Sequence, residues 1–428
     1  MISRDAFGAR AVALNGLSNV LRRRLALDDA LDLSGLEEER ERGFARLLVA
    51  TTLRRLGQID ALIAHCLKDP LPAKASLAQD ILRMGVAQLV FLEVPPHAVV
   101  DTAVNMAKAA KLTAHQKLIN AVLRRISREG RALADAQDAP RLNTPPWMWQ
   151  SWSAAYGAAT ARAIGEAHLH EAPLDISVKG DPALWAGPLE AEILPGGTLR
   201  RAAGGQVSAL PGYAEGAWWV QDAAAALPAR LLGDITGKRV ADLCAAPGGK
   251  TSQLAAAGAR VTALDRSEKR LDRLMKNLDR LDLWAEVVTA DAAVWRPDSP
   301  LDAVLLDAPC SATGTLRRHP DALWLKHPAD IAKLAATQDR LLLAALDMLK
   351  PGGTLVYCTC SLQYEEGAER IDALLAGHAP ARRIPITAAD LGGWSEGVTA
   401  VGDLRSLPCH MAEKGGMDGF FAARLERL

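Results

Sequence analysis

Apolar residues recur at helical spacing through the first third of the chain, with polar residues between them. Five segments carry this period: residues 6–27, 43–56, 76–92, 98–108 and 115–126. An apolar stripe of this kind is typical of a helix that buries one face. Asp69-Pro70 and Pro95-Pro96 interrupt the pattern between some of the segments. The pattern predicts a small all-α domain over residues 1–135.

The pattern changes near residue 237, where short apolar runs alternate with amphipathic stretches. Runs of strand length lie at residues 239–246, 259–265, 285–291, 301–307 and 353–359, and helical periodicity lies at 250–257, 267–281 and 330–349. Strands that alternate with helices indicate a mostly parallel sheet covered on both faces. We therefore expect a C-terminal α/β domain of the doubly wound, Rossmann-like kind over residues 216–428.

A stretch of different composition separates these two regions. Residues 136–145 are polar and contain prolines, as a linker does, and tryptophans then cluster at Trp147, Trp149 and Trp152. Short apolar runs at 174–178 and 191–194 are bounded by Gly and Pro, which favours short strands. The pattern predicts a small α+β module over residues 136–215 and assigns it no function.

Composition and charge narrow the class of protein. The chain has 428 residues and a formal net charge of zero, which disfavours an overall basic nucleic-acid binder but permits a local basic face. No apolar run is long enough to cross a bilayer, and residues 1–10 lack the apolar core of a signal peptide. We expect a cytoplasmic monomer with no membrane segment.

Basic residues gather on the last two helical segments of the first domain. They are Lys108, Lys111, Lys117, Arg124, Arg125, Arg128 and Arg131. Such a set is either a solvated helix face or a surface that contacts nucleic-acid phosphates. The sequence leaves both readings open.

A second constellation predicts a cofactor site at the carboxyl ends of the strands in the α/β domain. The first strand runs into Cys244-Ala245-Ala246-Pro247-Gly248-Gly249-Lys250, where two glycines let the backbone approach a ligand closely. Acidic residues follow along the same edge, and they are Asp242, Asp265, Asp291 and Asp307. Each could instead cap the next helix. The set as a whole favours a nucleotide cofactor, bound where doubly wound sheets bind ligands.

The motifs that are missing narrow the class of cofactor. The segment has neither the G-x-x-x-x-G-K-[ST] of a P-loop nor the G-x-G-x-x-G of a dinucleotide site. Strand ends lined by acids suit a cofactor that carries a sulfonium cation and no phosphate. No metal site is expected, because no His–Cys spacing suggests one.

Thiols lie at the mouth of the same crevice. The six cysteines are too sparse for a disulfide scaffold, and Cys66, Cys244 and Cys409 are best read as small buried hydrophobes. Cys310 follows the fourth strand, whereas Cys358 and Cys360 end the fifth and share a face of it if the strand is regular. A thiolate that adds to carbon 6 of cytosine makes carbon 5 nucleophilic toward a methyl sulfonium. The pattern leaves Cys310, Cys358 and Cys360 as candidate nucleophiles.

Three motifs together resemble those of the RNA cytosine-5 methyltransferases. They are Cys244 to Lys250, Asp307-Ala308-Pro309-Cys310-Ser311 and Thr359-Cys360-Ser361. Leu118-Ile119-Asn120-Ala121-Val122-Leu123-Arg124-Arg125 is similar to the NusB-like RNA-binding domain that some members carry. Trp219-Val220-Gln221-Asp222, Arg317-Arg318-His319-Pro320-Asp321 and residues 416–421 extend the match over nearly the whole chain, and the middle module matches least.

The resemblance implies a function and roles for individual residues. It implies S-adenosylmethionine as the cofactor and 16S, small-subunit ribosomal RNA as the partner. Cys360 is similar to the family's nucleophile, Cys310 to the cysteine that assists release of the enzyme–RNA adduct, and Asp307 to the residue that contacts the base and the cofactor. The residues implied to hold the cofactor are Cys244, Ala245, Ala246, Pro247, Gly248, Gly249, Lys250, Asp265, Asp291 and Asp307.

Two other functions compete with this interpretation. A non-catalytic RNA-binding or assembly factor would use the helical domain alone, and the intact thiol motifs disfavour it. Methyltransferases that act on exocyclic amines carry an aromatic residue after Asp/Asn-Pro-Pro. Here Asp307-Ala308-Pro309 is followed by Cys310, which argues against that class.

Overall fold

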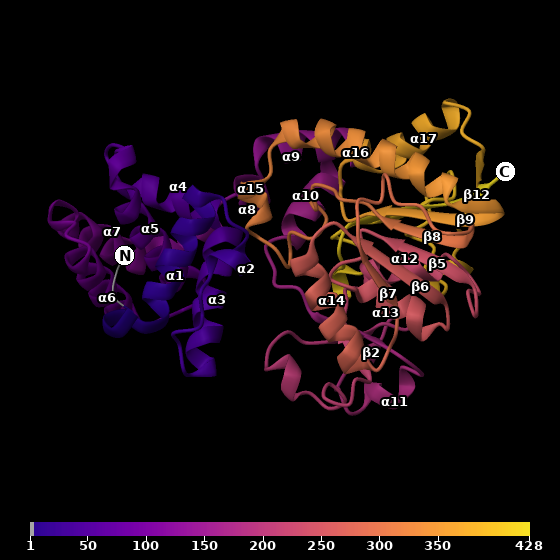
Figure 1. Cartoon of the computed structure of the whole chain (residues 1–428). Coiled ribbons are helices and arrows are strands. Elements are labelled where there is room, and N and C mark those ends of the chain that lie inside the picture. The colour runs from indigo at the N-terminus through magenta and orange to yellow at the C-terminus, as the bar shows by residue number, and fades with distance from the viewer. Residues whose placement is uncertain (1–3) are drawn as a thin grey trace. The chain divides into compact units, whose positions relative to one another are not determined.

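The computed structural model describes residues 4–428, which divide into a helical unit and a sheet unit (Figure 1). The helical unit contains residues up to His170 together with Leu316–Lys326, and the sheet unit contains Glu171–Thr315 and His327–Leu428. Residues 1–3, which begin the segment predicted to lack a signal peptide, lie outside the described residues. No described helix is both long and apolar enough to span a membrane.

The helical unit confirms the all-α prediction for the first domain. Its main helices are α1 (Arg4–Arg23), α3 (Glu39–Arg54), α4 (Leu56–Cys66), α5 (Ser76–Val86), α6 (Pro96–Ala109) and α7 (Thr113–Asp135). A single aliphatic core fills the space between them, with Leu14, Leu48 and Ile119 fully buried. The expected helix at 76–92 is α5 extended by a wider turn, Ala87–Phe91. The sequence pattern did not single out α4.

The structure divides the chain differently from the predicted boundary at residue 135. The helices α8 (Ala139–Leu142), α9 (Pro146–Tyr156) and α10 (Ala158–Ala167) group with the N-terminal helices. The tryptophan cluster lies on α9, where Trp152 is fully buried and packs edge-on against His168 at 5.5 Å. Hydrogen bonds join this segment to α4 and its start: Asn143 accepts the Gln58 N–H at 3.1 Å, and Arg55 donates to the Leu169 carbonyl at 2.9 Å. The polar composition of residues 136–145 had suggested a linker instead.

A segment from the second half of the chain also belongs to the helical unit. Residues Leu316–Lys326, which include α15 (Ala322–Leu325), leave the sheet unit after Thr315 and return to it at His327. Within the helical unit, Asp321 accepts a 3.0 Å hydrogen bond from the Leu27 N–H, and Trp324 donates one of 2.8 Å to the Leu53 carbonyl. The segment matched in the sequence as Arg317–Asp321 is thus anchored on helices almost three hundred residues earlier.

A small antiparallel sheet confirms the strands expected in the middle of the chain. Its order is β2 (Glu192–Ile193), β3 (Leu199–Arg201), β1 (Leu174–Val178) and β4 (Trp218–Val220), so the module extends past the predicted end at 215. Asp175 and Arg200 form a buried ion pair of 2.7 Å, and Asp175 also accepts the N–H of Ala223 at 2.9 Å. Arg200 donates to the Gly416 carbonyl at 2.6 Å. These bonds fasten the small sheet to the rest of the sheet unit.

The large sheet has the mixed topology of a methyltransferase-type α/β domain. Parallel strands β5 (Arg239–Leu243), β6 (Arg260–Asp265), β7 (Glu286–Thr289), β8 (Leu301–Asp307) and β9 (Leu349–Thr359) lie in the order β9-β8-β5-β6-β7. Antiparallel β12 (Phe420–Arg427) continues the sheet beyond β9 and pairs with β10 (Ala381–Arg383) and β11 (Leu404–Ser406). The pattern predicted the parallel strands and missed the antiparallel edge.

Helices cover both faces of this sheet, as expected (Figure 1). The helices α12 (Ala223–Arg230), α13 (Gly249–Ala256) and α14 (Glu268–Leu281) bury one face, and α16 (Pro328–Asp347) and α17 (Ala368–Ala376) bury the other. Successive residues of β5 alternate between the two cores, with Val240 in one and Ala241 in the other. Because the strands are buried on both faces, they read as continuous apolar runs.

Candidate active site

The candidate site lies where the strand order of the large sheet reverses. From β5 the chain moves outward to β6 and β7, and then crosses back to β8 and β9 on the other side of β5. Such a reversal opens a crevice beyond the carboxyl ends of the strands, and ligands of doubly wound folds bind there. All of the predicted cofactor and thiol residues follow these strand ends.

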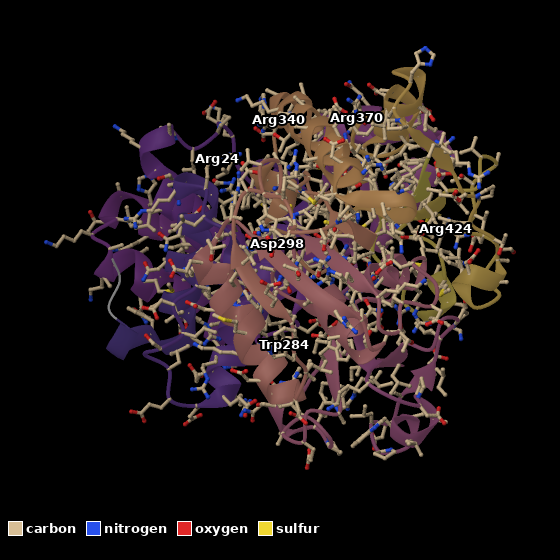
Figure 2. All side chains as sticks on the ribbon, turned by 45° about the vertical axis from the view of Figure 1, so that its right-hand side comes forward. Arg24, Trp284, Asp298, Arg340, Arg370 and Arg424 are labelled. Carbon is tan, nitrogen blue, oxygen red and sulfur yellow. The ribbon has the colours of Figure 1, made fainter. Side chains whose placement is uncertain are left out.

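A cavity of about 120 Å³ occupies this crevice and brings part of the predicted cofactor set together. Its lining includes Cys244 after β5, Asp265 at the end of β6, Asp291 after β7 and Pro309 after β8. Helices α14 and α16 contribute the cavity residues Arg270 and Arg340, and Figure 2 labels Arg340. The sequence did not single out either arginine.

The turn from β5 into α13 has the backbone that close approach of a ligand needs. Gly248 has a φ of 102° and stands directly before α13. A Cβ atom on Gly248 would lie 2.8 Å from the Leu274 Cγ atom, so any other residue would collide with α14. Cys244 also has a positive φ of 63°. Burial, followed by the charges of Asp307 and Asp265, raises the pKa of Cys244 to about 12, which keeps this thiol protonated.

Asp265 and Asp291 line the cavity and accept backbone N–H groups. Asp265 accepts the Ser267 N–H at 3.0 Å and the Ala246 N–H at 3.3 Å, and it pairs with Arg270 at 3.2 Å. Asp291 accepts the Ala293 N–H at 2.9 Å. The expectation that these acids cap the next helix is wrong, because Ser267 occupies the N-cap of α14 without a side-chain bond and the next helix after Asp291 begins at Ala322. Their hydrogen bonds hold the carboxylates at the edge of the cavity.

Asp242 turns away from the crevice. Its side chain is fully buried and accepts a 2.6 Å hydrogen bond from the Thr251 hydroxyl. Burial raises the pKa of Asp242 to about 7, even though the Thr251 bond acts in the opposite direction. The expectation that Asp242 lines the crevice is wrong, because Asp242 is buried against Thr251 of α13 and is not among the cavity residues.

Lys250 and Asp307 form a buried ion pair beside the thiols. The Lys250 Nζ atom lies 2.7 Å from the Asp307 carboxylate and 4.8 Å from the centre of the Phe420 ring. Burial acts to lower the pKa of Lys250, but the charges of Asp307, Cys358 and Cys360 raise it above its ordinary value. Lys250 is therefore held on Asp307, although the motif alone gave it to the cofactor.

The two thiols expected at the centre of the chemistry lie in contact. The Cys310 and Cys360 sulfurs are 3.5 Å apart, and both side chains are partly exposed. The hydrogen bond with Cys360, followed by burial and the charges of Cys360 and Glu366, raises the pKa of Cys310 well above its ordinary value. A protonated thiol is thus paired with a second sulfur at the carboxyl ends of β8 and β9.

The third candidate thiol, Cys358, is less suited to attack a ligand. It is completely buried, and its sulfur donates a long hydrogen bond of 3.6 Å to Asp307. Burial and the charge of Asp307 raise the pKa of Cys358 well above its ordinary value. Cys358 and Cys360 contact the same core cluster, as side chains two apart on a strand should. Cys360 is partly exposed and Cys358 is buried, a difference that the sequence pattern could not show.

The strongest hydrogen-bonded feature at the thiols was not found from the sequence. Glu366, in the turn Tyr364–Glu366, is fully buried and accepts hydrogen bonds from Ser311 and Ser361, the residues that follow Cys310 and Cys360. The sequence Tyr364-Glu365-Glu366 is typical of an exposed acidic turn, so nothing in it predicts a buried carboxylate. The one feature that could have indicated such a group is the serine that follows each of the two cysteines.

The basic set of the helical unit lies on exposed surface. Arg125 pairs with Glu129 at 2.5 Å, and Arg131 pairs with Glu93 and Asp135 at 3.7 and 3.2 Å. The other members are exposed and make no ion pair within residues 4–428, and they are Lys108, Lys111, Lys117, Arg124 and Arg128. This surface along α6 and α7 offers free positive charge.

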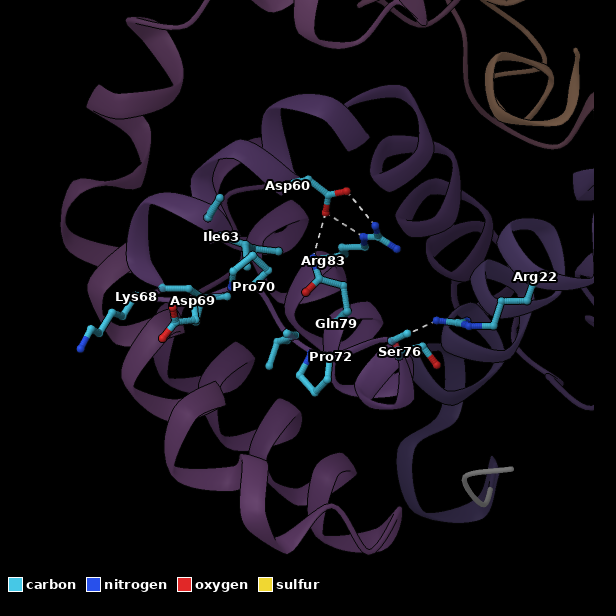
Figure 3. A pocket seen from close by; sticks show the side chains of 14 residues that line it. Arg22, Asp60, Ile63, Lys68, Asp69, Pro70, Pro72, Ser76, Gln79 and Arg83 are labelled. Atoms are coloured by element: carbon cyan, nitrogen blue, oxygen red, sulfur yellow. Dashed lines mark hydrogen bonds and ion pairs between the residues drawn. The ribbon is translucent and has the colours of Figure 1, made fainter.

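A cavity of about 460 Å³ in the same unit has a different character (Figure 3). Two arginines line it, and both point at acids: Arg83 holds Asp60 at 2.7 Å, and Arg22 pairs with Asp80. Paired guanidinium groups offer little to an added phosphate. Both interpretations of the basic residues on α6 and α7 stay open, and the arginines of this cavity do not add to that surface. Within residues 4–428 no group of acidic, His and Cys side chains could hold a metal.

Comparison with protein families finds one match mainly in each unit of the fold. The family described as 16S rRNA methyltransferase RsmB/F matches residues 229–426, which contain Cys244, Cys310, Cys358 and Cys360. The NusB family matches residues 8–128 of the helical unit. The two matches thus correspond to the crevice with its thiols and to the unit that carries the basic surface.

Comparison with individual proteins covers nearly the whole length. Ribosomal RNA small subunit methyltransferase B of Klebsiella pneumoniae is 36% identical over 97% of this chain and 97% of its own. The protein of the same name from Pseudomonas putida is 36% identical over 98% of both chains. The solved structure of a methyltransferase homolog from Pyrococcus horikoshii has a TM-score of 0.54 and 26% identity, and it covers 65% of this chain and 94% of its own.

Proposed function

The chain belongs to the RsmB/F family of 16S ribosomal RNA methyltransferases, and we propose that it methylates carbon 5 of a cytosine in small-subunit ribosomal RNA. Members of this family are enzymes that depend on S-adenosylmethionine. What we propose is that the modified base is cytosine, that the methylated atom is its carbon 5, and that the residues named below carry out the reaction. The observation that carries it is the pair of partly exposed sulfurs, Cys310 and Cys360, held 3.5 Å apart at the carboxyl edge of the sheet.

The crevice supports a cofactor with a cationic sulfonium. Two fixed carboxylates, Asp265 and Asp291, line the cavity together with Cys244 and with Arg266, Arg270 and Arg340. Lys250, which could have received a phosphate, is buried on Asp307 instead. In this proposal Asp265, Asp291 and the segment Cys244–Lys250 hold S-adenosylmethionine. When bound, this cofactor supplies an electrophilic methyl group.

Attack on the base falls to Cys360, because carbon 5 of cytosine is a poor nucleophile until a thiolate adds to carbon 6. The Cys360 sulfur forms the new bond to carbon 6, and the electron pair of the carbon 5–carbon 6 double bond moves toward ring nitrogen 3. A proton taken up from solvent at that nitrogen neutralises the developing charge. Asp307, held by Lys250 at 2.7 Å, is the group that we assign to accept the hydrogen bond from the protonated nitrogen.

Release reverses the addition once carbon 5 carries the methyl group. A base takes the carbon 5 proton, the double bond forms again as the bond between carbon 6 and the Cys360 sulfur breaks, and ring nitrogen 3 returns its proton to solvent. Cys310 lies 3.5 Å from that sulfur, and its raised pKa means that it carries a proton. We assign Cys310 to hydrogen-bond the departing sulfur, so that its loss slows release more than attack.

The test replaces Cys360 with Ala and measures transfer of a methyl group to 16S ribosomal RNA, with bisulfite sequencing to locate the modified cytosine. The matched control is Cys358→Ala, which removes a thiol two residues away on the same strand. We expect C360A to lose at least about 1,000-fold in rate, as removal of a covalent nucleophile does, and C358A to keep a rate within about ten-fold of the wild type. Normal transfer by C360A would overturn the proposal.

A further inference from the structure

The carboxylate of Glu366 lies between the two loops that carry the thiols. Its Oε1 atom accepts the Ser311 N–H at 2.9 Å and the Gln338 side-chain amide at 3.3 Å. Its Oε2 atom accepts the Ser361 hydroxyl at 2.6 Å and also the Ser311 hydroxyl. One carboxylate thus bonds to the residue after Cys310 and to the residue after Cys360.

The turn that carries Glu366 is itself fixed to the sheet. The Glu366 carbonyl accepts the Tyr357 hydroxyl at 2.8 Å and the Thr359 hydroxyl at 3.2 Å, both from β9. The neighbouring Arg370 of α17, labelled in Figure 2, pairs with Asp339 of α16 at 2.8 Å. Glu366 is therefore a rigid point from which both loops can be held.

Further bonds around the serines join the two loops, and Arg405 donates a 2.6 Å hydrogen bond to the Ser361 carbonyl. The Ser311 and Ser361 hydroxyls lie 3.0 Å apart, and Thr313 accepts the Leu362 N–H at 3.0 Å. Glu366, Ser311 and Ser361 are completely buried. Burying a carboxylate costs free energy unless hydrogen bonds compensate for the lost water, and here four hydrogen bonds do so. If this position served only to pack the core, an apolar residue would be sufficient.

We propose that Glu366 is a positioning residue that sets the separation of the Cys310 and Cys360 sulfurs through Ser311 and Ser361. It touches neither the base nor the cofactor and acts through the two loops. The proposal rests on the function assigned above to the thiols. It adds that the pair works only while this buried carboxylate fixes both loops in one register.

Glu366 also affects the ionisation of the thiol pair. Its charge is one cause of the raised pKa of Cys310, together with the hydrogen bond to Cys360, the burial of the thiol and the charge of Cys360. Tyr357 is a further titratable group beside Cys310: burial, followed by the charge of Cys310, raises the pKa of Tyr357. Removal of the Glu366 charge should favour the Cys310 thiolate, so the pKa of Cys310 should fall. If Glu366 only supported the fold, its replacement would leave the pKa of Cys310 unchanged.

The experiment compares Glu366→Gln with the matched control Glu365→Gln, which changes the same charge on the adjacent, exposed residue. Iodoacetamide labelling of the RNA-free protein, read peptide by peptide over a range of pH, reports Cys310 and Cys360 separately. We expect E366Q to move the Cys310 profile to lower pH and E365Q to leave it in place. With RNA, E366Q should lose at least about ten-fold in kcat with KM within about two-fold, because positioning affects the reacting geometry.

Two further variants keep the inference testable if E366Q does not fold. Ser361→Ala removes the bond from the second loop, and Ser311→Ala removes the hydroxyl bond while the Ser311 N–H stays on Glu366. Each variant keeps the carboxylate and should lower kcat with little change in KM, S361A more than S311A. An unchanged Cys310 profile in E366Q, an equal shift in E365Q, or full kcat in both serine variants would overturn the positioning role. Labelling needs no RNA, so a failure of the cytosine proposal in C360A would be distinguishable from a failure here.

Discussion

The two units of the molecule carry charge in opposite ways. In the helical unit the ion pairs of α7 lie at the surface, and two of them, Arg125–Glu129 and Arg131–Asp135, join residues one helical turn apart. In the sheet unit the charges that matter are buried and join distant parts of the sequence: Lys250 bonds to Asp307, and Glu366 bonds to serines of two loops. Exposed charges act additively and are screened by salt, whereas buried ones act through fixed geometry. The first arrangement suits binding of a polyanion, and the second suits chemistry.

The largest effect should come from breaking the buried pair. Lys250→Met removes the cation and leaves the Asp307 carboxylate without its partner in a site where Lys250 is fully buried. We expect a loss of at least about 100-fold in methyl transfer, together with destabilisation of about 3–5 kcal/mol by urea unfolding. The loss should exceed that of any single surface charge in the helical unit.

The control for that variant is Lys350→Met. Lys350 also pairs with an acid, Asp302, but the pair is partly exposed and lies at the start of β8, away from the thiols. This variant should keep nearly full activity and lose less than about 1 kcal/mol. Equal activity losses in the two variants would mean that buried and exposed pairs do not differ as the comparison requires.

A smaller and graded effect should come from the basic surface. Replacing Lys108, Lys117 and Arg124 together with Gln removes three exposed charges of α6 and α7. We expect RNA affinity to weaken and the slope of log affinity against log salt to fall by about two to three, while kcat at saturating RNA is kept. The salt slope is measured by filter binding.

The control changes three exposed charges elsewhere on the helical unit, namely Arg23, Lys68 and Lys74. It should leave the slope unchanged. A flat salt response of the wild-type protein, or equal slopes in the two triple variants, would remove the phosphate-contacting interpretation of α6 and α7. The solvated-face interpretation would then stand.

How much the sequence predicted depends on whether a feature is local. The strand at 301–307 and the strand at 174–178 were predicted with the bounds that the structure has, because their apolar runs are bounded sharply. The placement of Cys310 beside Cys360, and of Cys244, Asp265 and Asp291 at one cavity, was also predicted, because strand ends in a parallel sheet meet at one edge. Their roles stay predictions. Local pattern and sheet geometry were sufficient for these.

Features that depend on distant contacts were not predicted. The anchoring of residues 316–326 on the helical unit rests on bonds such as the one from Trp324 to the Leu53 carbonyl, which no periodicity encodes. The direction of Asp242 and the role of Glu366 depend on burial, and an acidic letter in a turn normally indicates exposure. The choice of Cys360 over Cys358 came from family resemblance and gains support from exposure alone.

The most direct test of the central claim identifies the sulfur that bonds to the base. In Cys310→Ala the account predicts slow release, so a covalent protein–RNA species should accumulate and survive denaturation. Nuclease and protease digestion followed by mass spectrometry would locate the attached nucleotide. Because Cys360 is the proposed nucleophile, we predict a methylated cytosine nucleotide attached to Cys360 and none attached to Cys358. Attachment at Cys358, or normal turnover of C310A with no covalent species, would contradict it.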